Sequence, residues 1–127
     1  MHKCMYVLDT NAVIYYVKED RDAVSSIEDI YTKNVPVYVS VMTEAELFGF
    51  PQLSNEEAER IEGFLRTVSI IPMDSQIARL TGAIRKTYQL KIADSVIAAT
   101  ALFTGTRLLT RNTRDFQRVP NLRVQGI

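Results

Sequence analysis

The stretch that decides the fold class is Lys91-Ile-Ala-Asp-Ser-Val-Ile-Ala-Ala-Thr-Ala-Leu-Phe-Thr104, followed by Gly105 and then by Arg107-Leu-Leu-Thr110. Its first part is apolar nearly all round, which is typical of a buried helix. Gly105 stands where helices commonly end in a left-handed conformation, and the short apolar run after it predicts a β-strand. A buried helix that leads directly into a strand indicates a sheet covered by helices.

The rest of the chain repeats this alternation of helix and strand. Ser54 and Glu57 form a capping box at the start of one helix, and Asp74 is expected to cap another. The pattern predicts one domain over residues 1–127, an α/β fold built as a three-layer α/β/α sandwich with a mostly parallel sheet of four to five strands. The expected strands are 5–8, 36–39, 68–72, 107–110 and an edge strand at 122–124, and the expected helices are 12–17, 23–33, 42–50, one opened by Ser54, one opened by Asp74, and 91–104.

The composition removes several classes of chemistry. Hydrophobic residues make up 46% and charged residues 24%, which is the balance of an ordinary globular protein. One cysteine, Cys4, and one histidine, His2, exclude a disulfide framework and a structural zinc site, and a catalytic triad could be built only on His2. The longest unbroken apolar run, 12–17, is too short for a membrane span, and no export leader is recognisable. We therefore expect a cytoplasmic protein whose chemistry comes from carboxylates, hydroxyls, amides or a metal.

Charge is unevenly distributed along the chain. The net charge is zero, yet residues 1–62 carry 5 basic and 12 acidic side chains, whereas residues 63–127 carry 10 and 3. This asymmetry favours a surface that faces nucleic acid or a protein partner. On charge alone, a solvated basic face explains it equally well.

Four carboxylates are expected at one edge of the sheet. Ligands of open parallel α/β sheets collect beyond the carboxyl ends of the strands. Asp9 directly follows the first strand, Glu46 lies near the start of the helix after the second, and Asp115 comes five residues after the strand 107–110. For that strand to be parallel to the others, the preceding helix must run antiparallel to the sheet, which brings Asp94 at its start to the same edge.

Asp94 carries the strongest functional signal of the four. It shares a helix stripe with Ile97 and Ala98, where a solvated acid does not belong, so its charge needs a partner, a metal or a shifted pKa. A hard divalent cation, Mg²⁺ or Mn²⁺, takes oxygen ligands and relieves the repulsion among clustered carboxylates. Such an ion lowers the pKa of a bound water and neutralises charge on a phosphate oxygen, which needs no histidine.

Each of the other acids also has a structural reading. Asp9 could simply cap the helix behind it, and Asp115 could be a loop residue or a helix cap. Glu46 could be solvated, as its neighbour Glu44 is expected to be. The two glutamates are two positions apart on one helix and point to different faces, so only one of them can line the edge.

Four short motifs follow one another along the chain: Leu8-Asp9-Thr10-Asn11, Thr43-Glu-Ala-Glu46-Leu47, Lys91-Ile-Ala-Asp94-Ser-Val-Ile-Ala-Ala99 and Leu109-Thr110-Arg111-Asn112-Thr-Arg-Asp115-Phe116. Together they resemble the PIN domain, and within that family the VapC-type toxins of toxin–antitoxin pairs. Each motif alone is weak, but the four occur in order and span nearly the whole chain. The resemblance implies an Mg²⁺- or Mn²⁺-dependent endoribonuclease that cuts single-stranded or structured RNA. It also implies a homodimer that a cognate antitoxin holds inactive.

The resemblance also implies roles for individual residues. The acidic catalytic and metal site would consist of Asp9, Glu46, Asp94 and Asp115, with Asp9 and Asp94 first among the direct metal ligands. Supporting positions would be Asn11, Thr110 and Asn112, and phosphate contacts would come from Arg111 and Arg114. Glu46 is preferred to Glu44 as the acid that faces the metal. A groove for the antitoxin could include Phe48, Phe50, Ile61 and Phe64, although these residues could equally belong to the core.

Two other functions compete with a nuclease. A receiver-type phosphoacceptor domain is also an α/β fold with acids at the sheet edge, but it requires an acidic pair after the first strand and a lysine after a late strand. Here Thr10 follows Asp9, and Arg111 follows Thr110. The third reading is a PIN-like module that binds RNA or protein without cutting, and the presence of all four acids argues against it.

Overall fold

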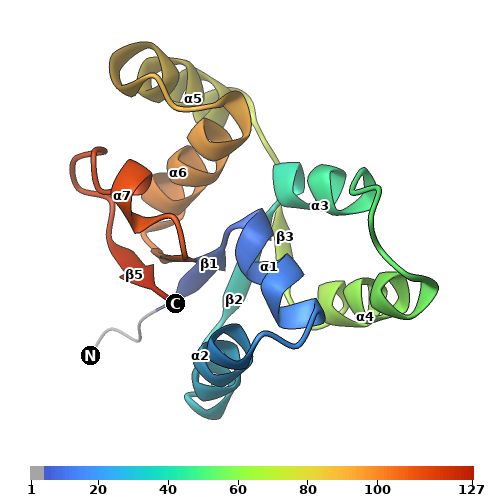
Figure 1. Ribbon diagram of the computed structural model, residues 1–127. Coiled ribbons are helices and arrows are strands. Elements are labelled where there is room, and N and C mark those ends of the chain that lie inside the picture. Colours follow the sequence, from blue (N-terminus) through green and yellow to red (C-terminus); the bar gives the residue numbers. More distant parts are fainter. Residues whose placement is uncertain (1–4) are drawn as a thin grey trace.

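The computed structural model describes residues 5–127, and it contains a five-stranded sheet in which every neighbouring pair of strands is parallel. The strand order is β3-β2-β1-β4-β5, so β1 lies at the centre and pairs with β2 and β4 (Figure 1). His2 and Cys4 lie outside the described residues. The strands are β1 (Tyr6–Leu8), β2 (Val37–Ser40), β3 (Ser69–Ile71), β4 (Arg107–Thr110) and β5 (Val124–Gly126).

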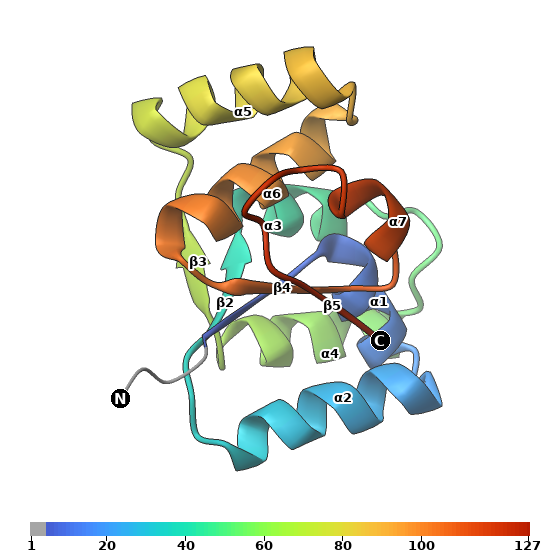
Figure 2. The ribbon, with the colours of Figure 1, turned by 90° about the vertical axis from the view of Figure 1, so that its left-hand side faces the viewer.

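Helices cover both faces of the sheet. Figure 2 shows α5 and α6 on one side of the strands and α2 and α4 on the other, so the predicted three-layer α/β/α sandwich is confirmed. In residues 5–127 no helix is both long and apolar enough to span a membrane. The helices are α1 (Thr10–Val17), α2 (Arg21–Thr32), α3 (Val41–Phe48), α4 (Asn55–Leu65), α5 (Ser75–Tyr88), α6 (Ile92–Thr104) and α7 (Thr113–Phe116).

The two faces of the sheet bury two separate cores because successive strand residues point to opposite sides. Leu8 packs into the core shared with α1, α2 and α4, whereas its neighbour Val7 packs into the core shared with α5 and α6. Leu109 and Leu108 on β4 divide in the same way. Burial on both faces is what a parallel sheet requires, and it explains why the strands are short continuous apolar runs.

Helix ends follow the local signals in the sequence. Ser54 and Glu57 form the predicted capping box, and the Asp74 side chain accepts a hydrogen bond from the backbone of Ile77. Gly105 ends α6 with a φ of 66°, a conformation that costs glycine little because it has no Cβ. The helix α1 begins at Thr10, two residues earlier than predicted, because Asp9 caps it.

Two features near the end of the chain differ from the prediction. A short helix, α7, was not expected, since four residues are too few to produce a helical periodicity. The edge strand occupies 124–126 rather than 122–124, because its register is set by pairing with β4, in which Leu108 lies opposite Val124. The strand order also excludes the receiver-type alternative, whose sheet has the order 2-1-3-4-5.

Candidate active site

The four predicted acids line one hollow at the carboxyl edge of the sheet. Asp9 follows β1, Glu46 lies on α3, Asp94 lies in the first turn of α6, and Asp115 lies on α7. Their side chains share a cavity of about 460 Å³ with Asn11 and Asn112, which we call the acidic hollow. Segments more than 100 residues apart in sequence therefore meet here, as the parallel sheet predicted. The full lining is Asp9, Asn11, Glu46, Gln89, Leu90, Lys91, Ala93, Asp94, Asn112, Asp115 and Arg118.

Asp9 is the most deeply buried of these acids, with 4% of its surface exposed. One carboxylate oxygen, Oδ1, accepts a hydrogen bond from the backbone N–H of Ala12 at 2.8 Å, and the other, Oδ2, accepts one from Thr110 Oγ1 at 2.5 Å. The helix-cap reading of Asp9 is thus correct, and it does not compete with a place in the site. Burial raises the pKa of Asp9 to about 6, and the nearby charges of Asp94 and Glu46 contribute in the same direction, although both hydrogen bonds oppose the rise.

A chain of hydrogen bonds connects Asp9 to Asp115 through the end of β4. Thr110 Oγ1 donates to Asp9 and also accepts from the backbone N–H of Asn112 at 2.9 Å. The Asn112 side chain in turn donates from Nδ2 to Asp115 Oδ2 at 3.1 Å. The predicted supporting residues Thr110 and Asn112 therefore lie between two of the acids and orient their carboxylates. Asn11, the third, is exposed and lines the acidic hollow.

Glu46, and not Glu44, lines the acidic hollow. Its Oε1 accepts a hydrogen bond from Thr10 Oγ1 at 2.5 Å, and Thr10 Oγ1 lies 3.1 Å from Thr43 Oγ1. Thr10 was not singled out in the sequence, because its link to Glu46 crosses 36 positions. Thr10, at the start of α1, therefore holds the exposed side chain of Glu46 in place.

Asp94 is half-buried, and its surroundings disfavour its charge. Burial raises its pKa, the charges of Glu46 and Asp115 raise it further, and the charge of Lys91 opposes the rise. The first turn of a helix stabilises an anion only weakly, by less than about 1 kcal/mol. Buried Asp9 and half-buried Asp94 thus carry charge repulsion that the surrounding side chains do not fully offset.

The donor set fits a hard divalent cation. Carboxylate and amide oxygens are the ligands that Mg²⁺ and Mn²⁺ prefer, and a cation would relieve the repulsion that raises the pKa of Asp9. As the side chains stand, no three acidic, histidine or cysteine side chains of residues 5–127 are close enough together to hold an ion directly.

The two arginines expected to contact phosphate lie outside the acidic hollow. Arg111 donates from Nη2 to Asp20 Oδ2 at 2.5 Å, and its guanidinium lies 4.1 Å from the centre of the Tyr15 ring. Arg114 is exposed on α7 and does not line the hollow. The phosphate role of both residues remains a prediction, and the structure gives Arg111 a different contact.

Two other basic side chains line the acidic hollow and were missed. Lys91 immediately precedes α6, and Arg118 follows α7 and donates a hydrogen bond from Nη2 to the backbone oxygen of Tyr88. Lys91 could have been noticed from its place three residues before Asp94. Arg118 had no such signal, because its place depends on a contact with the end of α5.

A second hollow of about 390 Å³ adjoins the acids on the side of α1 and α3. It shares Asp9, Asn11, Glu46 and Asp94 with the acidic hollow. Its other walls are mostly apolar. They are formed by Thr10, Ile14, Gly49, Phe50, Pro51 and Ile97. The acids therefore separate a basic wall from an apolar wall.

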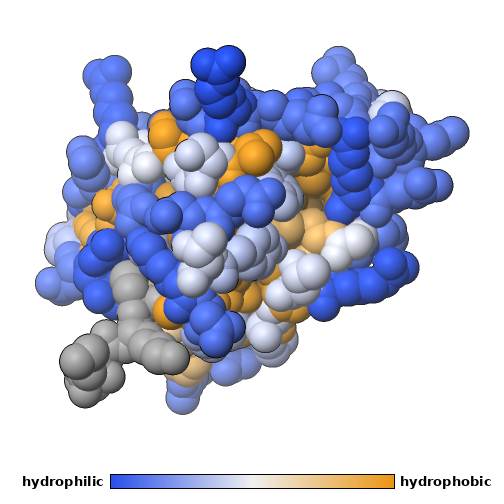
Figure 3. Space-filling model, turned by 90° about the horizontal axis from the view of Figure 1, so that it is seen from below, coloured by the Kyte–Doolittle hydropathy of each residue, from blue (hydrophilic) through white to orange (hydrophobic). Residues whose placement is uncertain are grey.

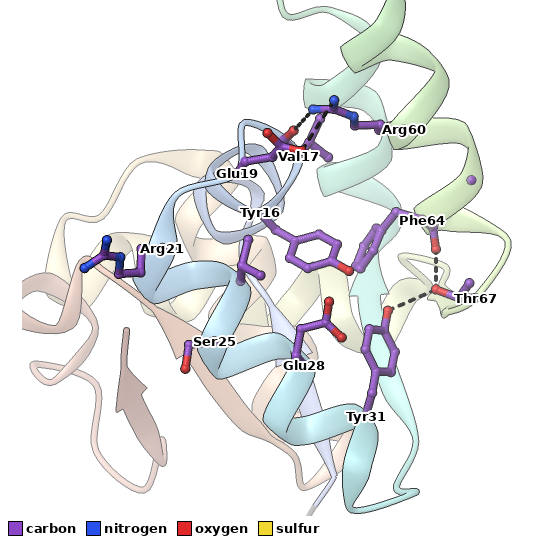
Figure 4. A pocket seen from close by; sticks show the side chains of 12 residues that line it. Tyr16, Val17, Glu19, Arg21, Ser25, Glu28, Tyr31, Arg60, Phe64 and Thr67 are labelled. Carbon is purple, nitrogen blue, oxygen red and sulfur yellow. Dashed lines mark hydrogen bonds and ion pairs between the residues drawn. The ribbon is translucent and has the colours of Figure 1, made fainter.

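A third hollow, of about 690 Å³, lies away from the acids among α1, α2 and α4, and we call it the helical groove. Its aromatic residues face one another, with the Tyr16 and Phe64 ring centres 5.6 Å apart and Tyr31 nearby (Figure 4). Arg60 at one end forms an ion pair with Glu19. On the face of the molecule that Figure 3 shows, apolar surface is confined to recesses between hydrophilic side chains.

The suggested antitoxin groove of four residues is not a single surface. Phe64 lines the helical groove, and Ile61 is buried in the core beneath it. Phe50 lines the hollow beside the acids, whereas Phe48 is 58% exposed on α3. The core reading is correct for Ile61, and Phe64 serves both as core and as groove wall.

Comparisons with known proteins show the family to which the chain belongs. The family model of the PIN domain matches residues 6–122. Ribonuclease VapC2 of Haemophilus influenzae is 33% identical over 130 residues, which cover 95% of this chain and 96% of that protein. A toxin–antitoxin complex from Klebsiella pneumoniae contains a chain that is 31% identical, with a TM-score of 0.75 and coverage of 92% and 94%. A crystal structure of VapBC2 from Rickettsia felis bound to a promoter DNA fragment matches in fold, with a TM-score of 0.82 at 23% identity and coverage of 97% and 98%. The chain belongs to the PIN domain family.

Proposed function

We propose that this chain is a metal-dependent endoribonuclease that cuts single-stranded RNA and acts as the toxin of a VapBC-type pair. The observation that carries the proposal is the meeting of four carboxylates from four separate parts of the chain in one hollow, with the pKa of Asp9 and of Asp94 raised. Structural acids that only cap helices have no reason to share a cavity. The similarity to a ribonuclease VapC and to toxin–antitoxin structures supports the same reading.

In this proposal, Asp9 and Asp94 hold the cation, with Glu46 and Asp115 completing its surroundings. A bound divalent ion would supply a water of lowered pKa and would stabilise charge on the phosphate oxygens. Asp9 is oriented by Ala12 and Thr110, and Glu46 by Thr10. Because these carboxylates are already oriented, little reorganisation is needed when the ion and the substrate bind.

Cleavage of a labelled single-stranded RNA by the purified protein tests this function. We expect cutting in Mg²⁺ or Mn²⁺ and none in excess EDTA. Asp94→Asn keeps the shape of the side chain and should lower the rate about 100-fold or more. Asp74→Asn is the matched control, since Asp74 caps α5 and does not line the acidic hollow, so its rate should equal that of the wild type. Binding of RNA without cutting in any metal would favour the non-cleaving module instead.

We propose that either Mg²⁺ or Mn²⁺ serves as the ion. Calorimetric titration of each into the wild type and into Asp94→Asn separates the candidates. Binding to the wild type in the micromolar to millimolar range, weakened in the variant, is the expected result. If the wild type binds neither ion alone, its titration should be repeated with single-stranded RNA present, because substrate phosphates often complete a magnesium site.

We further propose that the cognate antitoxin binds with an apolar helix face in the helical groove. The aromatic side chains of Tyr16, Tyr31 and Phe64 provide an apolar floor, and charged residues of both signs surround it. Such a groove suits an amphipathic helix. Toxin–antitoxin complexes among the similar structures support an antitoxin as the occupant.

Gly63 offers a way to block this groove without disturbing the acids. It lines the groove on α4, and a Cβ added there would meet no atom within 4 Å. Gly63→Leu should therefore fold and cut RNA normally but resist inhibition by the antitoxin. Gly82→Leu on α5, which has the same free space but lies outside the groove, is the matched control. Equal inhibition of both variants would contradict the groove assignment.

We also propose that the protein is a homodimer. Val41 at the start of α3, Met73 between β3 and α5, and Ile92 at the start of α6 are large apolar side chains with more than a third of their surface exposed. Light scattering should give twice the mass of the chain for the wild type and the single mass for a Val41→Glu, Met73→Glu variant. Phe103→Glu, an equally exposed apolar residue at the other end of α6, should leave the dimer intact.

A further inference from the structure

The two basic side chains of the acidic hollow come from parts of the chain that the acids do not use. Lys91 belongs to the turn between α5 and α6, and Arg118 to the segment between α7 and β5. Both are exposed, and neither takes part in an ion pair within the part of the chain that the structure describes. Their charges are therefore available to a ligand that enters the hollow.

Backbone contacts place these two charges along the same wall. Gln89 caps the C-terminal end of α5 with a φ of 58°. This left-handed residue turns the chain, and both Gln89 and Lys91 line the acidic hollow. Arg118 Nη2 donates to the backbone oxygen of Tyr88, the last residue of α5. One N–H group of the Arg118 guanidinium is used in this bond, and its other N–H groups make no hydrogen bond within residues 5–127.

The charge balance of the acidic hollow explains why cations are needed there. With all four carboxylates ionised, Lys91 and Arg118 bring the formal charge of the lining to −2, which one divalent cation would bring to zero. Without the two basic side chains, a polyanion entering beside the acids would meet a net negative wall even with the ion bound. The second hollow, on the side of α1 and α3, has no basic residue in its lining. A phosphate is therefore better received on the side of Lys91 and Arg118.

We propose that Lys91 and Arg118 form a phosphate subsite that holds the RNA backbone next to the acids. This inference rests on the proposed ribonuclease function and adds to it the side from which the backbone is bound. A guanidinium presents paired N–H donors that match phosphate oxygens, and an ammonium adds a point charge. Arg111 is less suited to this role, since Asp20 and Tyr15 already occupy its guanidinium.

Binding of a fluorescently labelled single-stranded RNA in excess EDTA tests the subsite apart from the chemistry. Lys91→Gln removes the charge without removing a helix cap, because the Lys91 side chain makes no capping hydrogen bond. Lys91→Gln and Arg118→Gln should each raise the Kd about tenfold at low salt and reduce the slope of log affinity against log salt by about 0.7. In Mn²⁺ the same changes should raise the KM for cleavage more than they lower kcat.

Two residues provide matched controls. Arg123 is an exposed arginine that also donates to a backbone oxygen at a helix end, that of Gly105, but it does not line the acidic hollow. Lys86 is an exposed lysine in the last turn of α5, five residues from Lys91 and also outside the lining. Arg123→Gln and Lys86→Gln change the net charge equally and should leave the Kd within about twofold of the wild type.

The outcomes separate this inference from the proposed function. Weaker binding confined to the Lys91 and Arg118 variants supports the subsite, and Kd values equal to those of the controls overturn it while cleavage by the wild type stands. A wild type that cuts RNA in Mn²⁺ but binds none in EDTA also overturns the subsite, and a wild type that neither binds nor cuts RNA overturns both. Should Arg118→Gln fail to fold, Arg118→Lys replaces it. That variant retains the charge but not the paired donors, so it should bind between the wild type and Lys91→Gln, and wild-type affinity would count against the guanidinium.

Discussion

The acidic hollow and the helical groove differ in what their residues do for the folded state. The groove is built from α1, α2 and α4, and the rings that line it also pack against the core. The acidic hollow is built from carboxylates whose burial and mutual repulsion raise the pKa of Asp9 and Asp94. A side chain of the groove therefore stabilises the fold, whereas a charge of the hollow weakens it.

Removing a groove ring should have the largest effect on stability. Phe64 is 5% exposed and its ring packs at a tilt of 55° against that of Tyr16, so Phe64→Ala should lower the free energy of unfolding by about 3–5 kcal/mol through lost burial and a cavity. Urea denaturation measures this change. Phe48→Ala, at a ring that is 58% exposed, should cost less than about 1 kcal/mol. Similar losses for both would show that the groove is not part of the core.

Charges in the acidic hollow should lower the free energy of unfolding, and this effect should be visible in its pH dependence. The folded pKa of Asp9, about 6, lies above its ordinary value of 3.8, so the folded state binds protons more tightly. The free energy of unfolding of the metal-free protein should therefore fall as the pH rises from about 4 to about 6, by up to about 3 kcal/mol from Asp9.

Asp9→Asn isolates this contribution. The asparagine oxygen can still accept from Ala12, so the helix cap survives while the charge is lost. In EDTA at neutral pH the variant should be more stable than the wild type, and its stability should fall less between pH 4 and 6. It should also lose metal binding in calorimetry. A variant less stable than the wild type at neutral pH would show that the ionised Asp9 stabilises the fold.

Thr110 should affect both the stability of the fold and the metal affinity of the acidic hollow. Thr110→Val keeps the shape but leaves Asp9 Oδ2 and the Asn112 backbone N–H without their partner, which should cost about 1–3 kcal/mol. Because the Thr110 hydrogen bond lowers the pKa of Asp9, its loss should raise that pKa further and weaken metal binding about 10–100-fold. Thr81→Val, at a buried threonine that donates to a helix backbone oxygen, should leave the metal affinity unchanged.

The smallest change in stability is expected for the exposed ion pair of Asp20 and Arg111. The hydrogen bond from Arg111 lowers the pKa of Asp20, so the contribution of this pair is present above pH 4 and is lost as the solution becomes more acidic. Asp20→Asn keeps the cap of α2 and should lower the Tm slightly at low salt and not at all at high salt. Unchanged metal affinity would confirm that this pair lies outside the acidic hollow.

Local signals in the sequence were enough for most of the fold. Gly105, the Ser54–Glu57 box and Asp74 mark helix ends by interactions within a few residues, and strand 107–110 has the predicted bounds. The shifted edge strand and the helix α7 could not be predicted in this way. Strand register depends on the partner strand, and a four-residue helix has no periodicity to detect.

The sequence by itself determined that four acids lie at the carboxyl edge of a parallel sheet, because strand direction and helix direction follow from the alternation of elements. Only the tertiary structure decided which partners these acids have. Thr110 reaches Asp9 across 101 positions, Thr10 selects Glu46 rather than Glu44, and Arg111 turns to Asp20 across 91 positions. Helix caps and apolar patterns depend on near neighbours in the chain, whereas burial, pKa and side-chain partners depend on distances through space that exist only once the layers have packed.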